Sequence, residues 1–239
     1  MSGLPTFCVV LPMYNELPNV APCIERLSAF LNSVPTRTAI IAVDDGSTDG
    51  TLGELRRLED AIPSLIVEVR PQNGGYGAAN RAGFAAALRE GFEYAVVMDA
   101  DGTQDPKYIE GFFAPMRAGK DFIKATRYAS GGRVIGVDWR RYAISWIGNR
   151  LARIVLRCDL TDYTNGFRAI RSSLLDRLET RETTFVVLVE EVRMARRLRA
   201  TFAEAPYTLT VRDHGSGRSK FSYSWRTYLN YLKHLLLGR

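Results

Sequence analysis

Two aspartates that flank one small residue, Asp99 and Asp101, are the side chains whose types and spacing most clearly suggest chemistry. Residues two apart in an extended segment point the same way, so both carboxylates can share one hard cation. Oxygen ligands of this kind suit Mg²⁺ or Mn²⁺. Such a metal would bridge the carboxylates to a diphosphate and neutralise charge on a leaving phosphate. The alternative is a solvated turn or a helix cap, because Asp and Gly both favour turns.

The surroundings of this pair favour the metal interpretation. Continuous apolar runs of this length, separated by helical patterns, predict buried parallel strands at 7–11, 39–43, 65–69 and 94–98, with a weaker fifth at 122–126. Polar clusters follow the first four strands, at 12–16, 44–50, 73–77 and 99–102. Ligands bind outside the carboxyl ends of the strands in open α/β sheets. We therefore expect all four clusters to meet at one edge of the sheet.

The segments between these strands carry helical signals. Apolar residues fall on one face at 20–31 and 52–58, the second after a capping cluster at 47–49, and an Ala-rich helix is expected at 78–88. Pro106 stands where a helix accepts proline in its first turn. The pattern predicts an α/β fold, a mostly parallel sheet with helices on both faces and right-handed crossovers.

The second half of the chain is less regular. It predicts helices at about 140–157 and 189–200, a strand over 202–211 interrupted by Pro206, a Gly-containing loop at 215–217 and an amphipathic segment at 223–237. With no internal repeat and no low-complexity linker, one compact domain is the simpler interpretation.

Asp45 and the glycine-rich turn each allow two interpretations. A carboxylate after the second strand of such a sheet can accept ribose hydroxyls or base N–H groups, and Asp44 and Asp45 can also cap the next helix. The glycines in 73–77 either let backbone approach a ligand or a helix closely, or form a plain tight turn.

Composition bounds the class of protein. The net charge of +6 favours acidic partners, but no stripe of alternating basic and aromatic residues is present, which argues against nucleic acid. Apolar stretches stay well short of the roughly 18 residues of a membrane span, and the N-terminus lacks a secretory pattern. Three separated cysteines, Cys8, Cys23 and Cys158, are expected to be core thiols.

Six segments together resemble the inverting family 2 glycosyltransferases with the GT-A fold, and among them dolichol-phosphate mannosyltransferases and bacterial polyprenyl-phosphate glycosyltransferases. Each segment alone is weakly specific, but the six occur in the family's order. The resemblance implies a catalytic domain over 1–221, and the amphipathic pattern of the residues after it predicts a helix over 222–239. The matching segments are Val10–Glu16, Asp44–Thr51, Met98–Asp101, Thr126–Tyr128, Thr164–Arg168 and Ser219–Lys220.

The resemblance also implies residue roles. A nucleoside pocket would be lined by Pro12, Tyr14, Glu16, Val43 and Asp45. Asp99, Ala100 and Asp101 would meet metal, diphosphate and sugar, with Asp99 and Asp101 as the metal ligands. Arg127 would contact phosphate, and Arg212 and Lys220 would close over the donor. Asp101, Arg127 and Lys220 are thus the catalytic candidates.

Two positions depart from the family pattern. The family often has Gln two residues after the second Asp, where this chain has Thr103, with Gln104 one later; the departure concerns the sugar contacts. The family's Arg lies closer to the Ser-Lys pair than Arg212 does, so Arg218 could substitute for Arg212.

The expected reaction moves a hexose, mannose or glucose, from a GDP- or UDP-sugar to a polyprenyl phosphate. A phosphate monoester has a second pKa of about 6, so it is mostly dianionic at pH 7 and attacks without a base. The enzyme must instead hold two anionic groups, the donor diphosphate and the acceptor phosphate, together with a metal, Arg and Lys. The basic candidates are Arg127, Arg140, Arg141, Arg168, Arg212, Arg218 and Lys220.

Two alternatives stay open. A sugar or small-molecule hydroxyl acceptor would require a carboxylate base; Glu190 and Glu191 are the nearest candidates, although a role as helix-surface charges is favoured for them. A non-catalytic sugar-nucleotide-binding protein is the other, and the intact Asp99 and Asp101 argue against it.

The C-terminal segment bears on location. Its Trp, Tyr and Leu residues share one face, which suits a membrane interface, core packing or a dimer contact. The expected location is the cytoplasm, peripheral at the cytoplasmic face of an anionic membrane.

Overall fold

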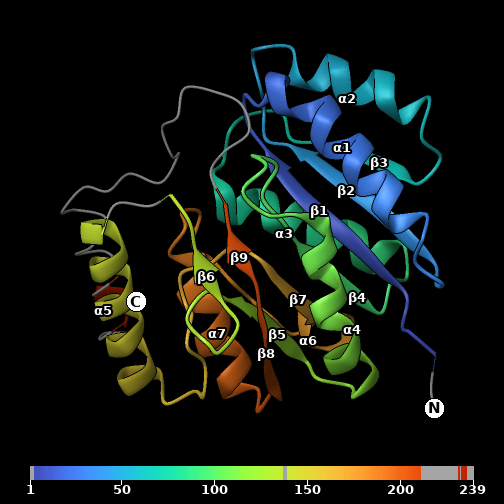
Figure 1. The fold of residues 1–239 in the computed structure, drawn as a ribbon. Coiled ribbons are helices and arrows are strands. Elements are labelled where there is room, and N and C mark those ends of the chain that lie inside the picture. The colour runs from blue at the N-terminus through green and yellow to red at the C-terminus, as the bar shows by residue number, and fades with distance from the viewer. Residues whose placement is uncertain (1–2, 137–138, 211–230, 232, 236–239) are drawn as a thin grey trace.

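The computed structural model describes residues 3–136, 139–210, 231 and 233–235. Its first half confirms the predicted alternation of strands and helices (Figure 1). The strands are β1 (Phe7–Met13), β2 (Thr38–Asp44), β3 (Leu65–Val69) and β4 (Tyr94–Val97). The helices between them are α1 (Leu17–Leu31), α2 (Thr51–Glu59) and α3 (Tyr76–Arg89).

The second half completes the sheet with shorter elements. After the 3₁₀ turn Pro106–Ile109 come α4 (Glu110–Arg117), β5 (Phe122–Thr126), β6 (Arg133–Val134) and α5 (Trp139–Leu156). They are followed by β7 (Arg168–Arg171), α6 (Ser172–Leu175), α7 (Val187–Arg197), β8 (Phe202–Pro206) and β9 (Thr208–Leu209). The strand expected over 202–211 is thus divided after Pro206, as its sequence predicted.

The main sheet has the strand order β3-β2-β1-β4-β7-β5-β8. Strands β1 to β4 are parallel to one another, while β7 runs antiparallel to both of its neighbours. The chain order turns back between β1 and β4, which is the switch point where such sheets bind ligands. The predicted mostly parallel sheet is therefore confirmed, with β7 as an antiparallel strand that the pattern did not reveal.

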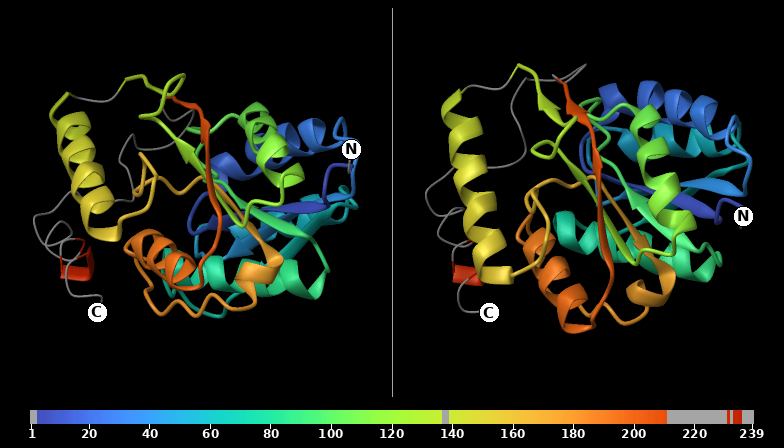
Figure 2. Two further views of the ribbon diagram at one scale, coloured as in Figure 1. Left: turned by 90° about the horizontal axis from the view of Figure 1, so that it is seen from below. Right: turned by 60° about the horizontal axis from the view of Figure 1, so that its bottom comes forward.

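Two apolar cores cover the two faces of this sheet. One holds the inward residues of α1, α2 and α4, and the other those of α3, α6 and α7, with Ala152 and Leu156 of α5. Helix α3 lies very close to the strands, because a Cβ atom at Gly83 would stand 2.3 Å from Val10. Two further views show the helices on both faces (Figure 2).

The cysteines are core thiols, as predicted. Cys8, Cys23 and Cys158 are all buried and unpaired. Burial raises the pKa of the Cys23 thiol to about 12, so it stays protonated and unreactive at neutral pH.

Most of the C-terminal segment 222–239 lies outside the described residues. In the described part, Leu235 is buried in the core beside α3 and α7, and the Tyr231 hydroxyl donates to the carbonyl of Phe185 at 2.8 Å. Arg193 of α7 donates to the carbonyl of Leu235 at 2.8 Å. Of the three roles considered for this segment, these residues take the core-packing one.

Candidate functional site

The polar clusters that follow β1 and β2 meet at one edge of the sheet, as predicted. The backbone N–H of Asn15 donates to the Ser47 hydroxyl at 2.9 Å, and its side-chain oxygen accepts from the N–H of Thr48 at 2.8 Å. The N–H of Glu16 donates to the Thr51 hydroxyl at 2.9 Å. These contacts tie the two loops together, so the side chains they carry have fixed relative positions.

The residues expected to line the nucleoside pocket lie along this edge. Pro12 and Val43 are direct neighbours in the β1–β2 register. Tyr14 is exposed, whereas Glu16 is nearly buried and accepts a hydrogen bond from Asn19 at 2.6 Å. Sequence reasoning thus placed these four side chains on neighbouring segments correctly, while their contact with a nucleoside stays a prediction.

Asp45 is buried and surrounded by hydrogen-bond donors. It accepts from the backbone N–H groups of Gly74 at 3.1 Å and Gly75 at 2.8 Å, and it forms an ion pair with Arg70. Gly75 has a φ of +86°, a conformation that favours glycine. The glycine-rich turn therefore brings backbone amides to Asp45, and Arg70 is a member of this site that the sequence did not single out.

The helix-cap interpretation of Asp44 and Asp45 is not realised. Helix α2 begins after Gly50 and receives no side-chain cap at that residue. Asp49 instead accepts from the N–H of Thr51 at 3.0 Å. Asp44 is buried and accepts from the N–H of Ser47 at 3.3 Å, so both members of the pair serve the loop rather than the helix.

Asp99 and Asp101 lie just after β4, and the contacts described for each of them include hydrogen bonds to neutral groups. The Gln104 amide donates to Asp99 Oδ2 at 2.8 Å and accepts from the Asp99 N–H at 2.9 Å. Thr103 donates to Asp101 Oδ1 from its hydroxyl at 2.6 Å and from its N–H at 3.1 Å. Gln104 is buried, so it orients Asp99 rather than reaching a sugar.

This donor set fits a divalent cation. Carboxylates oriented by neutral outer hydrogen bonds keep their charge for a hard metal ion. Among the described residues no group of three or more His, Cys, Asp or Glu side chains gathers as a complete metal cage. Mg²⁺ and Mn²⁺ are commonly bound by one or two carboxylates, with water and substrate phosphates as further ligands.

The loop over residues 162–166 approaches Asp99 from the other half of the chain. A Cβ atom at Gly166 would stand 3.2 Å from Asp99 Oδ1 and 2.6 Å from the Tyr76 hydroxyl. A larger residue would press against both side-chain ends, so glycine suits this close approach of the backbone to the carboxylate. The Thr-Asn-Gly segment singled out in the sequence therefore forms part of the wall around Asp99.

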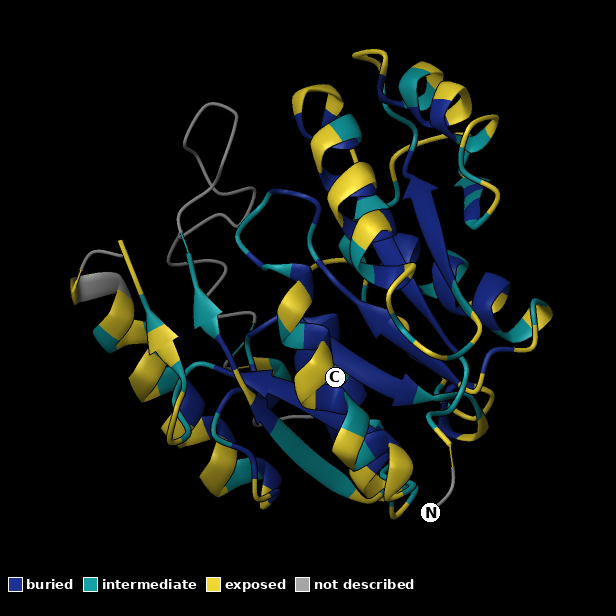
Figure 3. Ribbon diagram, turned by 45° about the vertical axis from the view of Figure 1, so that its right-hand side comes forward, coloured by how far each residue is buried: buried dark blue, intermediate teal, exposed yellow. Residues whose placement is uncertain are grey.

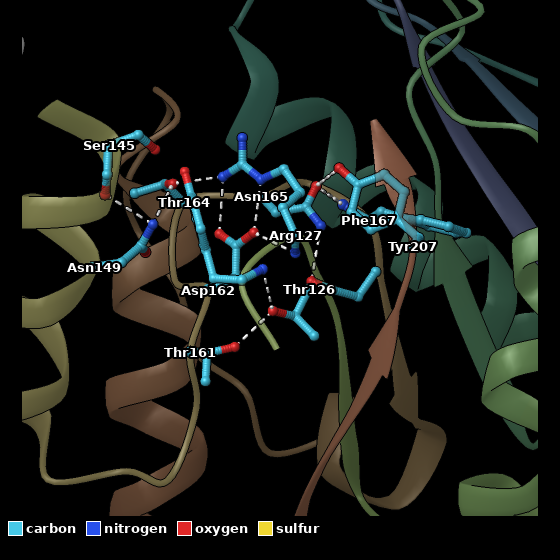
Figure 4. A network of polar contacts seen from close by, with 12 residues as sticks. Thr126, Arg127, Ser145, Asn149, Thr161, Asp162, Thr164, Asn165, Phe167 and Tyr207 are labelled. Carbon is cyan, nitrogen blue, oxygen red and sulfur yellow. Dashed lines mark hydrogen bonds and ion pairs between the residues drawn. The ribbon is translucent and has the colours of Figure 1, made fainter. Parts of the chain in front are cut away.

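The same loop holds Arg127, at the end of β5 (Figure 4). Its Nε donates to Asp162 at 2.7 Å, and its Nη2 donates to Asp162 at 2.9 Å and to the Thr164 hydroxyl at 3.1 Å. Burial alone would lower the pKa of Arg127, but the Asp162 carboxylate raises it above its ordinary value. Arg127 is thus a permanent cation whose Nη1 group has no hydrogen-bond partner among the described residues.

Asn165 and Asn149 fix this loop from both sides. The Asn165 amide donates to the carbonyl of Ala125 at 2.8 Å and accepts from the Tyr207 hydroxyl at 3.1 Å. Asn149 of α5 accepts from the N–H of Tyr163 at 2.6 Å. The loop that presents Arg127 is therefore held by hydrogen bonds to segments that lie elsewhere in the sequence.

A second ion pair corrects two sequence expectations. Arg168 and Glu191 are both fully buried, with Arg168 Nε 2.5 Å from Glu191 Oε2. Arg168 is therefore not one of the basic side chains that hold a phosphate, and Glu191 is not a helix-surface charge; both expectations were wrong. Glu190 is also occupied, since it accepts from the N–H groups of Arg181 at 3.1 Å and Glu182 at 2.9 Å.

Lys124 lies beside these ion pairs and was not anticipated. Its side chain is fully buried, and its Nζ has no hydrogen-bond partner among the described residues. Burial, and then the nearby Arg168, lower the pKa of Lys124 to about 7. A buried lysine in this position is costly, because its charged form has lost water without gaining a partner.

Several predicted site residues lie outside the described part of the chain. Arg212, Arg218 and Lys220 belong to the segment 211–230, and the side chains of Arg140 and Arg141 are likewise not described. Ala100 is buried between the two aspartates. Sequence reasoning also missed Asp162 and Arg70. No local pattern marks either residue, because each is a charged residue whose partner lies far away in the sequence.

Comparison with known proteins identifies the class. Residues 8–179 match the family described as Glycosyl transferase family 2, and the chain belongs to this family. Its membership and the site residues define a glycosyltransferase.

Two relatives show which members of the family the chain resembles. The chain is 36% identical over 172 residues to the polyprenol monophosphomannose synthase of Mycolicibacterium smegmatis, an alignment that covers 72% of this chain and 63% of that protein. It is 32% identical over 216 residues to the undecaprenyl-phosphate mannosyltransferase of Micrococcus luteus, covering 87% of this chain and 85% of that protein. The chain thus spans less than two thirds of the first relative and most of the second.

Solved structures confirm the GT-A fold. The glucosyl-3-phosphoglycerate synthase of Mycobacterium tuberculosis, in complex with Mn²⁺ and UDP-glucose, superposes with a TM-score of 0.68 at 22% identity. The superposition covers 97% of this chain and 79% of that one. At this level of identity the likeness establishes the fold alone.

Proposed function

We propose that this chain transfers a hexose, with inversion, from a nucleotide diphosphate sugar to a polyprenyl phosphate. The observation that carries the proposal is the loop 162–166, which binds two oppositely charged groups at once. Asp162 and Thr164 hold the Arg127 guanidinium, and the Gly166 backbone lies against Asp99. A carboxylate that can recruit a metal and a cation that can meet phosphate are therefore positioned by one segment.

The donor would lie across the ends of β1, β2 and β4. Asp99 and Asp101 would hold Mg²⁺ or Mn²⁺, which supplies charge neutralisation for a diphosphate leaving group when bound. Pro12, Tyr14, Glu16, Val43 and Asp45 would receive the nucleoside, with Ala100 beneath the sugar and diphosphate. Arg127 would donate from Nη1 to a phosphate oxygen, an interaction strengthened by its charge. Arg212, Arg218 and Lys220 are proposed to contribute from the segment after β9.

A phosphate acceptor agrees with the carboxylates that the structure describes. A hydroxyl acceptor would require a base, yet Glu191 is buried in its ion pair and Glu190 is bound to backbone N–H groups. A phosphate monoester is mostly dianionic at neutral pH and attacks the anomeric carbon directly. The enzyme would need only to align the reactants and offset their charges.

The relatives support the acceptor and the sugar. Both are named for transfer of mannose to a polyprenyl-type phosphate. We therefore propose mannose from GDP-mannose as the first donor to test, with UDP-glucose second, since the structural neighbour binds UDP-glucose with Mn²⁺.

We also propose that the enzyme works at the cytoplasmic face of a membrane, where a polyprenyl phosphate is found. In the described ranges, no helix combines the length and the apolar character that crossing a bilayer requires. A peripheral attachment would bring the site to its acceptor.

The test is sugar transfer into lipid. The protein is incubated with Mn²⁺ or Mg²⁺, radiolabelled GDP-mannose or UDP-glucose, and either a polyprenyl phosphate or the matching polyprenol. We expect label in the organic extract only with the phosphate. Label in polyprenol would indicate a hydroxyl acceptor, and label confined to the aqueous phase would refute the lipid acceptor.

A further inference from the structure

Helix α5 presents an unusual apolar face to solvent. Of the eleven large apolar side chains exposed in the described part of the chain, seven belong to α5. Four of them, Ile144, Ile147, Leu151 and Ile154, follow one another at intervals of three and four residues and so form one stripe. Ile147 is 53% exposed and Ile154 is 71% exposed. A contiguous patch of this kind marks a docking surface rather than ordinary scatter.

The helix lies at the outer edge of the molecule. It stands apart from the sheet in all views (Figures 1 and 2), and its outer side is coloured as exposed along most of its length (Figure 3, left). The opposite side is anchored, because Ala152 and Leu156 are buried in the core. The helix is thus held by one face, and the stripe lies on the other.

The charges on the helix itself are all positive, while Asp159, three residues past its end, forms an ion pair with Arg153. Residues 139–157 contain five arginines, Arg140, Arg141, Arg150, Arg153 and Arg157, and no Asp or Glu. The Arg150 guanidinium lies 5.1 Å from the centre of the Trp146 ring, whose side chain is also exposed. Aliphatic residues, tryptophan and long basic side chains on one helix are typical of a segment that lies in a membrane interface.

The anchored face of the same helix reaches the catalytic site. The Asn149 amide donates to the Thr164 hydroxyl at 3.4 Å, and Thr164 accepts from Arg127 at 3.1 Å (Figure 4). The apolar stripe and the loop that presents Arg127 therefore lie on two sides of one helix. Anything that binds the stripe is placed within one helix diameter of that loop.

We propose that the exposed face of α5 docks onto an anionic lipid surface. A membrane with negative headgroups complements both the apolar stripe and the arginines beside it. A second copy of the chain complements mainly the stripe, because it would bring further arginines to a helix without acidic residues of its own, and the neighbouring Asp159 already pairs with Arg153. The lipid surface is therefore the occupant that the charges favour.

This surface differs from the one that the sequence suggested. The amphipathic segment over 222–239 was considered for a membrane interface, yet its described residues Tyr231 and Leu235 pack inward. This inference adds a membrane surface as a docking partner to the proposed function. It rests on that function, because docking would bring the site to a lipid acceptor. Vesicle binding needs no donor, metal or turnover, so each proposal can fail without the other.

The test is flotation of the purified protein with vesicles of phosphatidylcholine alone or mixed with phosphatidylglycerol. The wild-type protein should float with the anionic vesicles and not with the neutral ones. The variant Ile147→Glu/Ile154→Glu should lose more than about tenfold in its vesicle partition coefficient, since two large apolar side chains would no longer be buried. Both side chains are exposed in solution, so the melting temperature should stay unchanged.

A matched control separates docking from overall charge. Arg56→Glu, on the exposed side of α2, changes the net charge by the same two units and should float like the wild type. Equal flotation of Ile147→Glu/Ile154→Glu and wild type would overturn the proposal. The proposal would also be overturned if light scattering showed a dimer without lipid that the α5 variant, but not the control, dissociates. The stripe would then be a contact between two copies of the chain. Flotation without sugar transfer would leave this proposal standing and refute the lipid acceptor.

Discussion

The two charged halves of the site are built in different ways. On the acidic side, Asp99 and Asp101 follow a buried strand and are oriented by the neutral partners Gln104 and Thr103, at most five residues away. On the basic side, Arg127 is held by Asp162, and the neighbouring Arg168 by Glu191, over separations of 35 and 23 residues. The hydrogen-bond donors described for the two aspartates are neutral groups, whereas carboxylates hold the two arginines and offset their charge within the protein.

This contrast implies a division of labour. Substitutions on the acidic side should impair activity and leave stability nearly unchanged, because the carboxylates lie at a strand end. Substitutions on the basic side should first affect folding, because they leave a buried charge without its partner. The predictions below test this division.

The largest effect is expected for Asp101→Ala. Loss of a metal ligand should lower kcat/KM by about 10³-fold or more, equivalent to at least about 4 kcal/mol of transition-state stabilisation. The melting temperature and circular dichroism should match the wild type. An active variant would remove the metal assignment, and an unfolded one would break the division between the two sides.

The second largest effect, here on stability, is expected for Arg168→Met. It leaves Glu191 buried and unpaired, which should cost about 3–5 kcal/mol of unfolding free energy. The double variant Arg168→Met/Glu191→Met removes both charges and should recover most of that loss. Urea denaturation of the single and double variants measures both values, and equal stability of Arg168→Met and wild type would show that the pair carries no structural charge.

Lys124→Met should stabilise the protein by about 1–4 kcal/mol, because it replaces a buried cation that lacks a hydrogen-bond partner. The pKa of Lys124 falls from 10.5 to about 7 on folding. Between these values the unfolded chain binds more protons, so the wild-type unfolding free energy should gain a contribution that rises with pH. The variant should lack this contribution; identical pH profiles from pH 7 to 10 would contradict the assignment.

The smallest effect is expected for Gln104→Ala. It removes the side chain that orients Asp99 without removing a proposed metal ligand, so metal affinity should fall about 10–100-fold. The fold should be retained, and calorimetric titration with Mn²⁺ measures the change. If the variant instead altered only the choice between sugars, Gln104 would contact the donor rather than support Asp99.

The same contrast explains how far sequence reasoning could go. The strands before Asp45 and Asp99 are continuous apolar runs, and a parallel sheet places their ends together, so the acidic side followed from local patterns. On the basic side, β7 begins and ends with arginine, and its antiparallel pairing depends on residues far away in sequence. Arg168 was interpreted as a phosphate-binding cation and Glu191 as a helix-surface charge, because each has its partner on another element.

Nucleotide binding measured with and without metal tests the central claim most directly. Isothermal titration of GDP and UDP would be performed on the wild type and on Asp99→Asn/Asp101→Asn, each with Mn²⁺ and with EDTA. We predict that the wild type binds one of these nucleotides much more tightly with Mn²⁺, and that the variant loses this gain while remaining folded. An affinity that is the same in EDTA, or that the variant retains in full, would contradict a metal site at Asp99 and Asp101.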